Sequence, residues 1–402
     1  MNTTNTPNSE RLHIVILGAT NSGKSSLLNA ITGQHTSVVS DVEGTTTDMI
    51  HKAIELPDIG ASLIIDTPGF DDQSILGEKR MQQTLLAVDK ADVAILICGN
   101  KSLTDIPDLS SEIEWFGKLK ERKIPVITVI NKIDIRTNTS ELSQKLHELF
   151  GQEALEVSVA SPESIENIRQ AILKKIPEDY GSSSITGNLV AEGDLVMLVM
   201  PQDAQAPKGR LILPQVQTIR ELLDKKCIIV SCTPEKMQES LSVLKNMPKL
   251  IITDSQAFKY VFENIPAESR LTSFSVLFAG YKGDIKYFAN SAKAIESLTE
   301  TSRVLIAEAC THAPATEDIG RVKIPNLLRK KVGKGLTIDI VSGNDFPKDL
   351  GKYDLIIHCG ACMFNRKYVL NRIEQAKYQN IPITNYGIAL AQLNGILPKI
   401  VY

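Results

Sequence analysis

The most constraining feature of this 402-residue chain is the octapeptide Gly18-Ala19-Thr20-Asn21-Ser22-Gly23-Lys24-Ser25. It follows a short apolar run and precedes a stretch with helical periodicity. Its glycines let backbone N–H groups close around phosphate oxygens at a helix N-terminus, so Gly18, Asn21, Ser22, Gly23 and Ser26 are expected in the phosphate site. We expect Lys24 to contact the phosphates and Ser25 to bind Mg²⁺. A strand, loop and helix joined in this way predict a parallel α/β domain.

A second motif, Asp66-Thr67-Pro68-Gly69, follows the next hydrophobic strand. We expect Asp66 to enter the Mg²⁺ shell and Gly69 to sense the γ-phosphate. The loop between the two motifs contains three consecutive threonines, of which Thr46 is our choice for a Mg²⁺ contact. A neighbouring threonine in the same loop is the alternative.

The identity of the nucleotide base is predicted by a third motif, Asn131-Lys132-Ile133-Asp134, which ends another apolar strand. The Asp134 carboxylate can accept two N–H donors from the edge of guanine, and adenine lacks that donor pair. Residues Ser158, Val159 and Ala160 are expected to close over the base. In this order and spacing the motifs predict a site for GTP and GDP.

Composition narrows the classes of partner. The net charge of -3 gives no overall attraction to nucleic acid or an anionic membrane. Apolar runs such as 93–98 fall far short of the ~20 residues that a membrane span requires. Residues 1–10 are polar and predict a flexible tail without a signal peptide. We therefore expect a cytoplasmic protein with free thiols and with neither nucleic-acid nor membrane partners.

The chain is too long for one core, and its alternating pattern predicts three α/β blocks. They are a P-loop nucleotide domain over 11–178, a small domain over 179–265 that carries no chemical motif, and a Rossmann-like domain over 266–402. Residues 181–184, Gly-Ser-Ser-Ser, look like a flexible linker. The expected strands cover 13–17, 62–65, 93–98, 126–130, 195–200, 227–231, 275–278, 303–308, 336–341, 354–358 and 381–385.

Two clusters of soft ligands lie in the last block, Cys310-Thr311-His312 and His358-Cys359-Gly360-Ala361-Cys362. Each follows a predicted strand, so both are expected at the carboxyl edge of one sheet. Residues 363–377 have helical periodicity. We therefore expect the Cys359/Cys362 pair to open a helix, whose N-terminus would favour the thiolate form.

The residues alone leave several interpretations of these clusters open. A structural zinc ion would take the three cysteines and one histidine. A redox dithiol would use Cys359 and Cys362 only. An iron–sulfur cluster would take three thiolates and leave one iron with a weaker ligand, and inert buried thiols are the remaining alternative. The other cysteines, Cys98, Cys227 and Cys232, are expected to be small buried hydrophobes.

The first block resembles the translation-factor-like GTPases, in particular the subgroup related to the tRNA-modification GTPase. The resemblance rests on the ordered motifs, on Asn21 and on the apolar Phe70 that follows Asp-Thr-Pro-Gly. It implies that Asn21 helps bind an activating potassium ion. It also implies that Glu78, twelve residues after Asp66, acts in catalysis together with Lys24 and Thr46. A solvated surface charge is the alternative for Glu78.

Nearly the whole chain resembles the [FeFe]-hydrogenase maturation GTPases (HydF). The resemblance rests on a Cys-x-His that is followed, after 45 residues, by His-Cys-x-x-Cys behind such a GTPase. It implies that Cys310, Cys359 and Cys362 bind a [4Fe–4S] cluster. His312 and His358 would lie beside the cluster, as ligands or as packing residues.

The same resemblance implies that the middle block forms a homodimer. It also implies that a di-iron precursor is delivered to apo-[FeFe]-hydrogenase, with the radical-SAM maturation enzymes as further partners. The runner-up is an RNA- or ribosome-associated GTPase with a structural zinc domain. The aromatic fraction of 5% and the slightly acidic charge argue against it.

Overall fold

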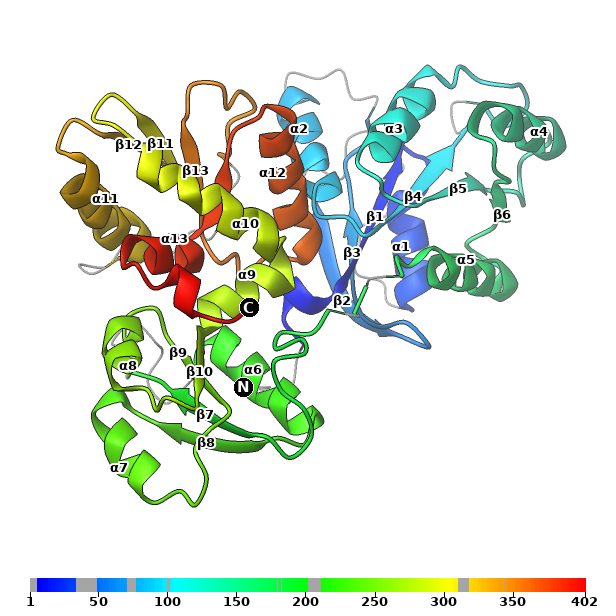
Figure 1. Ribbon diagram of the computed structural model, residues 1–402. Coiled ribbons are helices and arrows are strands. Elements are labelled where there is room, and N and C mark those ends of the chain that lie inside the picture. The colour runs from blue at the N-terminus through cyan, green and yellow to red at the C-terminus, as the bar shows by residue number, and fades with distance from the viewer. Residues whose placement is uncertain are drawn as a thin grey trace. The chain divides into compact units, whose positions relative to one another are not determined.

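The computed structural model describes residues 6–33, 49–70, 77–99, 102–178, 180–181, 183–201, 211–309, 318–343 and 345–402. The chain forms two compact units, Met1–Tyr180 and Gly181–Tyr402, which we call unit 1 and unit 2 (Figure 1). Each unit is described by itself below.

Unit 1 is built on a six-stranded sheet with the order β2-β3-β1-β4-β5-β6. All neighbours are parallel except β2, which pairs antiparallel with β3. The strands are β1 (Leu12–Gly18), β2 (Ile50–Leu56), β3 (Gly60–Asp66), β4 (Val93–Cys98), β5 (Val126–Asn131) and β6 (Leu155–Val157). The helices are η1 (Asn8–Glu10), α1 (Lys24–Thr32), α2 (Gly77–Val88), α3 (Ser110–Glu121), α4 (Thr139–Phe150) and α5 (Pro162–Lys175).

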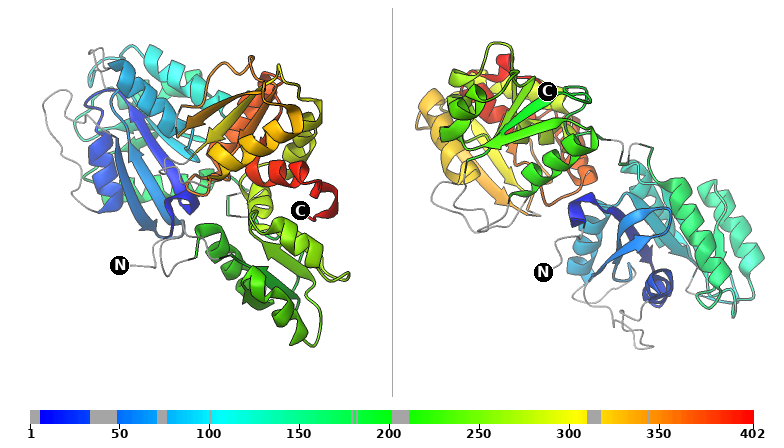
Figure 2. Two further views of the ribbon diagram at one scale, coloured as in Figure 1. Left: turned by 90° about the vertical axis from the view of Figure 1, so that its left-hand side faces the viewer. Right: turned by 90° about the horizontal axis from the view of Figure 1, so that it is seen from below.

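Helices cover both faces of this sheet, as both views of Figure 2 show. Along β1, Ile14 belongs to the apolar cluster that includes Leu28 of α1. Its neighbour Val15 belongs to the opposite cluster, which includes Trp115 of α3. Successive strand residues point to opposite faces, so a strand covered on both sides is an unbroken apolar run. The predicted parallel α/β domain is confirmed, although the antiparallel strand β2 was not foreseen.

Unit 2 contains two four-stranded parallel sheets, in the orders β10-β9-β7-β8 and β12-β11-β13-β14. The first sheet has β7 (Leu195–Val199), β8 (Ile228–Cys232), β9 (Leu250–Thr253) and β10 (Arg270–Ser273), with α6 (Leu213–Asp224), η2 (Pro234–Lys236), α7 (Met237–Ser242), α8 (Phe258–Asn264) and α9 (Phe274–Lys282). The second has β11 (Arg303–Glu308), β12 (Thr337–Ser342), β13 (Leu355–His358) and β14 (Ile383–Asn385), with α10 (Ile285–Ser291), η3 (Ala292–Ser297), η4 (Ile319–Lys323), α11 (Ile324–Val332), α12 (Arg366–Tyr378), α13 (Tyr386–Leu393) and η5 (Leu397–Lys399).

The strand predicted over 275–278 is wrong, because these residues lie in helix α9. The Ser273 side chain caps this helix by accepting a hydrogen bond from the Val276 amide at 3.3 Å. Helix α9 is buried nearly all round, so its apolar run showed no helical period. The preceding strand β10 pairs with β9, and the first sheet therefore extends beyond residue 265, where the middle block was expected to end.

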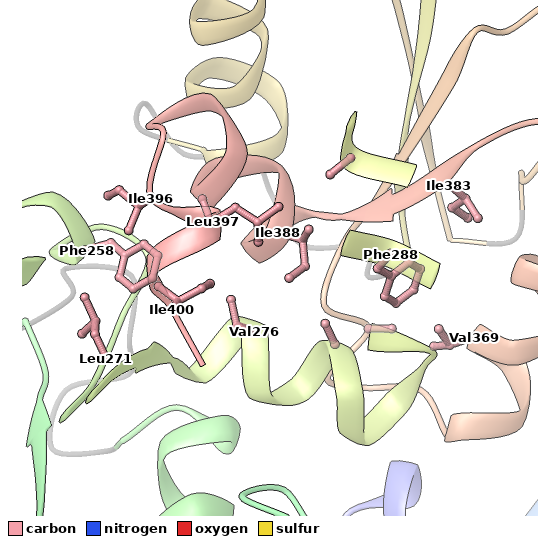
Figure 3. Packing of buried hydrophobic residues seen from close by; sticks show 14 of the residues in the cluster. Phe258, Leu271, Val276, Phe288, Val369, Ile383, Ile388, Ile396, Leu397 and Ile400 are labelled. Carbon is pink, nitrogen blue, oxygen red and sulfur yellow. The ribbon is translucent and has the colours of Figure 1, made fainter. Parts of the chain in front are cut away.

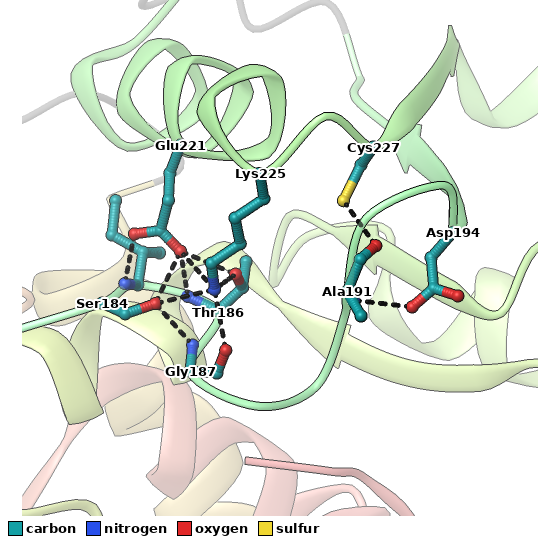
Figure 4. Close-up of polar contacts among 9 residues, drawn as sticks. Ser184, Thr186, Gly187, Ala191, Asp194, Glu221, Lys225 and Cys227 are labelled. Atoms are coloured by element: carbon teal, nitrogen blue, oxygen red, sulfur yellow. Dashed lines mark hydrogen bonds and ion pairs between the residues drawn. The ribbon is translucent and has the colours of Figure 1, made fainter.

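Ser184, expected in a flexible linker, is fixed to helix α6 (Figure 4). Its hydroxyl donates a hydrogen bond of 2.8 Å to Glu221 of α6, and Thr186 donates another of 2.6 Å to the same carboxylate. Lys225, one turn further along, donates to the Gly187 carbonyl at 2.7 Å. The start of unit 2 is thereby held by a network of side chains.

The two sheets of unit 2 share one hydrophobic core (Figure 3). Phe258 and Leu271 come from the first sheet and its helices, Ile383 from the second, and Val276 of α9 packs between them. Near the carboxyl end, the Val401 amide donates to the Leu271 carbonyl at 3.0 Å. Residues of both sheets pack in this one core, so the two sheets belong to the same compact unit.

Candidate functional site

The phosphate loop joins β1 to α1 in the predicted way. Lys24 is buried, and its ammonium group donates to the carbonyls of Gly18 at 3.0 Å and Ala19 at 2.8 Å. Gly23 has a φ of 88°, and a Cβ there would lie 2.3 Å from Nδ2 of Asn131. That amide nitrogen donates to the Ser22 carbonyl at 2.9 Å. Only glycine fits at position 23, because the loop packs directly against the base motif.

The Mg²⁺ side of the site is built from Ser25 and Asp66. The Ser25 hydroxyl donates to Oδ2 of Asp66 at 2.6 Å. Asp66 is fully buried, and its Oδ1 has no hydrogen-bond partner among the described residues. Burial raises the pKa of Asp66. The hydrogen bond from Ser25 and the charge of Lys24 lower this pKa, but by less than burial raises it. A buried carboxylate oxygen beside a serine hydroxyl is a donor set that fits a hydrated Mg²⁺ ion.

The end of β3 touches the phosphate loop. A Cβ at Gly69 would lie 2.3 Å from the Thr20 hydroxyl oxygen and 2.6 Å from its amide nitrogen. The next residue, Phe70, is 9% exposed and stacks on Trp115 with ring centroids 6.2 Å apart. Position 70 therefore supplies packing and no polar group for orienting water.

The motif expected to bind the nucleotide base, Asn131 to Asp134, lies at the same edge of the sheet as the phosphate loop. Lys132 has a φ of 63°, and its ammonium group donates to the Asn21 carbonyl at 2.9 Å. The Ile133 amide donates to the Val157 carbonyl at 3.3 Å, which brings the motif next to the loop that carries Ser158. In that loop Ser158 is buried, and Val159 and Ala160 are exposed. Asp134, at the end of the base motif, is exposed as well. The structure thus gathers the phosphate loop, Asn131 to Asp134, and 158–160.

Two predicted catalytic residues are not described in full. Thr46 lies outside the described residues, which leave out 34–48. Glu78 lies in helix α2, but its side chain is outside the described part of the chain. Their catalytic roles stay predictions.

The cysteine cluster follows strand β13, at its carboxyl end as predicted. The Cys359 sulfur accepts hydrogen bonds from the amides of Ala309 at 3.0 Å and Ala361 at 3.4 Å. Cys359 and Cys362 are both half-buried. Cys310 and His312 lie outside the described residues.

The expectation that the cysteine pair opens a helix is wrong. Helix α12 begins at Arg366, and the Asn365 side chain caps it by accepting from the Tyr368 amide at 3.3 Å. Cys359 and Cys362 therefore lie in the loop before the cap. N–H groups that point at the Cys359 sulfur provide the stabilisation of negative charge that the helix end was expected to give.

His358 is oriented by two contacts. It is 1% exposed, with Nδ1 2.7 Å from the Cys359 carbonyl oxygen and Nε2 2.9 Å from an Arg372 nitrogen. Arg372 can only donate, so Nε2 accepts and Nδ1 carries the proton. Burial, with the Arg372 charge, lowers the pKa of His358 to about 3. With both nitrogens engaged, the geometry favours the packing role of His358 over the ligand role.

Arg372 was missed by the sequence reasoning. It lies on α12, fourteen residues after His358, and no motif spacing connects the two. Its other terminal nitrogen donates to the Gly343 carbonyl at 2.6 Å. Only the packing of α12 against the strand ends brings it to the histidine.

Within the described residues, no group of three or more His, Cys, Asp or Glu side chains is placed to hold a metal ion. Of the three predicted cluster ligands, only Cys359 and Cys362 are described, and both offer soft sulfur donors, which suit iron–sulfur clusters. Cys98 and Cys227 are buried and Cys232 is half-buried. In the described part of the chain no helix is both long and apolar enough to span a membrane.

Family models match nearly the whole of unit 2. A model of the hydrogen maturase F dimerization domain matches residues 185–283, and one of the hydrogen maturase F tetramerization domain matches 286–402. The chain belongs to the HydF family. A third model, of a 50S ribosome-binding GTPase, matches 13–132, so unit 1 is a P-loop GTPase domain.

Curated relatives match this GTPase domain. The tRNA modification GTPase MnmE of Caldicellulosiruptor saccharolyticus is 32% identical over 42% of this chain and 35% of its own length. GTPase Der of Mycoplasmopsis pulmonis is 37% identical over 37% of this chain and 35% of its own length. The chain thus spans about a third of these relatives. A crystal structure of Era from Aquifex aeolicus covers 58% of this chain and 97% of its own, at 20% identity and a TM-score of 0.37.

These matches confirm the predicted HydF resemblance and the GTPase. They also support the self-association expected for the middle block and add a second domain to it. Dimerisation was predicted for the middle block, and the HydF domains of unit 2 indicate self-association through two domains. The sequence reasoning assigned no self-association to the last block.

Proposed function

We propose that this HydF-family GTPase binds a [4Fe–4S] cluster through Cys310, Cys359 and Cys362 and delivers a di-iron precursor to apo-[FeFe]-hydrogenase. The observation that carries the proposal is the cysteine loop after β13 in a hydrogen maturase domain, where two amides already point at the Cys359 sulfur. Such N–H donors stabilise a thiolate ligand. His358 keeps its place beside the cluster by its bonds to Arg372 and the Cys359 carbonyl.

In the GTPase domain, Lys24 would hold the phosphates, Ser25, Thr46 and Asp66 the Mg²⁺ ion, and Asp134 the guanine edge. Potassium near Asn21 would offset phosphate charge, and Glu78 would take the place of a water-orienting glutamine. Hydrolysis would control partner exchange with the hydrogenase and the radical-SAM maturation enzymes. The cytoplasmic location stays a prediction.

The proposal is tested by anaerobic reconstitution of Cys310→Ser, Cys359→Ser and Cys362→Ser. A serine oxygen is a harder ligand than sulfur, so each variant should lose most of its iron and sulfide, and hydrogenase activation with it. GTP hydrolysis should persist in all three. Cys232→Ser is the matched control, because that half-buried thiol lies in unit 2 and has no assigned role.

Two results would contradict the proposal. Zinc without sulfide in the wild-type protein would favour a structural metal site. Full cluster content in Cys310→Ser would remove the three-cysteine assignment.

A further inference from the structure

Arg136 is a buried arginine that follows the base motif closely, two residues after Asp134. Its exposed fraction is only 6%. Moving a guanidinium group out of water costs free energy, which hydrogen bonds inside the protein must offset. The partners of this group therefore show which parts of the domain Arg136 holds together.

The guanidinium group of Arg136 donates to four oxygen atoms from two stretches of chain. In its own stretch it donates to the Asn131 carbonyl at 3.4 Å and to Oδ1 of Asn138 at 3.0 Å. In the loop after β4 it donates to the carbonyls of Gly99 at 2.9 Å and Ser102 at 3.0 Å. One side chain thus closes the turn over 131–138 and ties it to the loop of the neighbouring strand.

The loop after β4 is itself fixed at Gly99. This residue has a φ of 75°, and a Cβ there would lie 2.4 Å from Cδ2 of Leu142 on α4. The Gly99 amide donates to Oε1 of Glu112 on α3 at 3.3 Å, while the Gly99 carbonyl accepts from Arg136. Glu112 is 1% exposed, so a buried acid and a buried base bind the same glycine. Arg136 is therefore anchored to a well-packed part of the domain.

Asp134 is exposed in the turn, between the buried residues Asn131 and Arg136. The backbone of the turn is closed by the amides of Ile135 and Arg136, which both donate to the Lys132 carbonyl at 3.1 Å. A carboxylate that accepts two N–H donors at once must be held in one position, and fixing it before the nucleotide arrives lowers the entropy cost of binding. The Arg136 side chain supplies such a restraint, because it bonds to the turn and to the loop after β4.

We propose that Arg136 is a positioning residue for guanine recognition, which holds the turn so that the Asp134 carboxylate meets both N–H donors of the base. The inference rests on the proposed function, since it needs Asp134 to bind guanine. A lysine could not take this role. Its ammonium group is a compact point charge, whereas the planar guanidinium group directs its donors toward several oxygens at fixed angles.

The test compares GDP with inosine diphosphate, whose base lacks the 2-amino group and offers Asp134 one donor in place of two. Calorimetric titration of the full chain in the presence of Mg²⁺ gives both dissociation constants for wild type, Arg136→Lys and Asn138→Ala. Their ratio reports how well the carboxylate is placed. A variant that is partly unfolded binds both nucleotides more weakly by the same factor, so a loss of stability alone leaves the ratio unchanged.

Wild type should bind GDP more tightly than inosine diphosphate. In Arg136→Lys the affinity for GDP should fall about tenfold and that for inosine diphosphate about twofold, so that the ratio falls about fivefold. Asn138→Ala removes one of the four acceptors and should lower the ratio by less. This milder variant decides alone if Arg136→Lys does not fold.

Arg122→Lys is the matched control. Arg122 is a half-buried arginine of the same domain, which donates to the Lys118 carbonyl at 3.2 Å and to Asp89 at 2.9 Å. Its replacement should leave the ratio at the wild-type value.

Three outcomes would overturn the inference. An unchanged ratio, with both affinities lowered by one factor, would show that Arg136 only stabilises the fold. Unchanged affinities in the folded variants would show that the turn keeps its place without this side chain. Equal binding of GDP and inosine diphosphate by the wild type would refute the contact of Asp134 with the base, and that result is seen before any variant is examined.

Discussion

The hydroxyl of Ser25 donates a hydrogen bond of 2.6 Å to Oδ2 of Asp66, so the first turn of α1 and the end of β3 meet at a fully buried carboxylate. The other oxygen of this carboxylate has no hydrogen-bond partner in the described part of the chain. Burial raises the pKa of Asp66, which means that the folded domain disfavours the charge that Mg²⁺ binding requires. Stability and function are therefore opposed at this residue.

Asp66→Asn should separate these two effects. Because its folded pKa is raised, ionised Asp66 destabilises the folded state once the pH exceeds the unfolded pKa, and the cost is complete above the folded pKa. The neutral amide should therefore raise the melting temperature of the nucleotide-free protein at pH 7, and lower GTP hydrolysis by about 100-fold. Exposed Asp58→Asn is the control. A lower melting temperature than wild type would contradict the argument.

Asp134→Asn should change the choice of base. The carboxylate accepts two N–H donors from guanine, and an amide would present one donor in place of one acceptor. GTP affinity should fall by about tenfold or more, while xanthosine triphosphate, which carries a carbonyl there, should bind better than to wild type. Calorimetric titration with both nucleotides measures this. Equal binding of ATP and GTP by the wild type would refute the guanine assignment.

Hydrolysis should be faster in potassium than in sodium, and Asn21→Gly should abolish the difference. Asn21 has a φ of 59°, which glycine adopts without strain, so this substitution removes the side chain and keeps the loop. The Lys132 contact is to the Asn21 carbonyl and should survive. Rates are compared in the two chlorides at equal ionic strength. Equal wild-type rates would rule out this role of Asn21.

The nucleotide site could be predicted from sequence because its residues lie at the ends of consecutive parallel strands. A sheet of this kind brings strand ends together whatever the packing details. The cysteine loop was placed after β13 for the same reason. Contacts that depend on packing could not be predicted: Arg372 reaches His358 from α12, and Gln215 and Cys362 line the same cavity from different domains of unit 2. The run at 275–278 was misjudged because a helix buried on all sides loses its period.

Glu221→Gln should destabilise unit 2, in a pH-dependent way. Burial raises the pKa of Glu221, but hydrogen bonds from Thr186, Ile185 and Ser184 outweigh it and the net pKa is lowered. A lowered folded pKa contributes stability that is present above the unfolded pKa and is lost as the pH falls through the folded value.

The variant should therefore lower the free energy of unfolding by about 1–2 kcal/mol at pH 7 and by less at pH 3. Urea unfolding at both pH values measures this. Glu239→Gln, at an exposed residue that pairs with Lys236 at the surface, is the control. An equal loss at both pH values would show that the charge of Glu221 does not matter.

Ile228→Lys should halve the mass of the assembly. Strand β8 is at the edge of its sheet, where it pairs with β7 among the described strands, and Ile228 on it is 58% exposed. Leu223, at the end of the adjacent helix α6, is 58% exposed as well.

An apolar edge strand in a dimerization domain is the surface that a second copy would cover, and a lysine on an edge strand opposes such pairing. With the tetramerization domain intact, one of the two kinds of interface would remain. Sedimentation of wild type and variant measures the mass, and Val243→Lys, at a 79% exposed residue that follows helix α7, should match wild type. An unchanged mass in Ile228→Lys would place the dimer contact on another face of the domain.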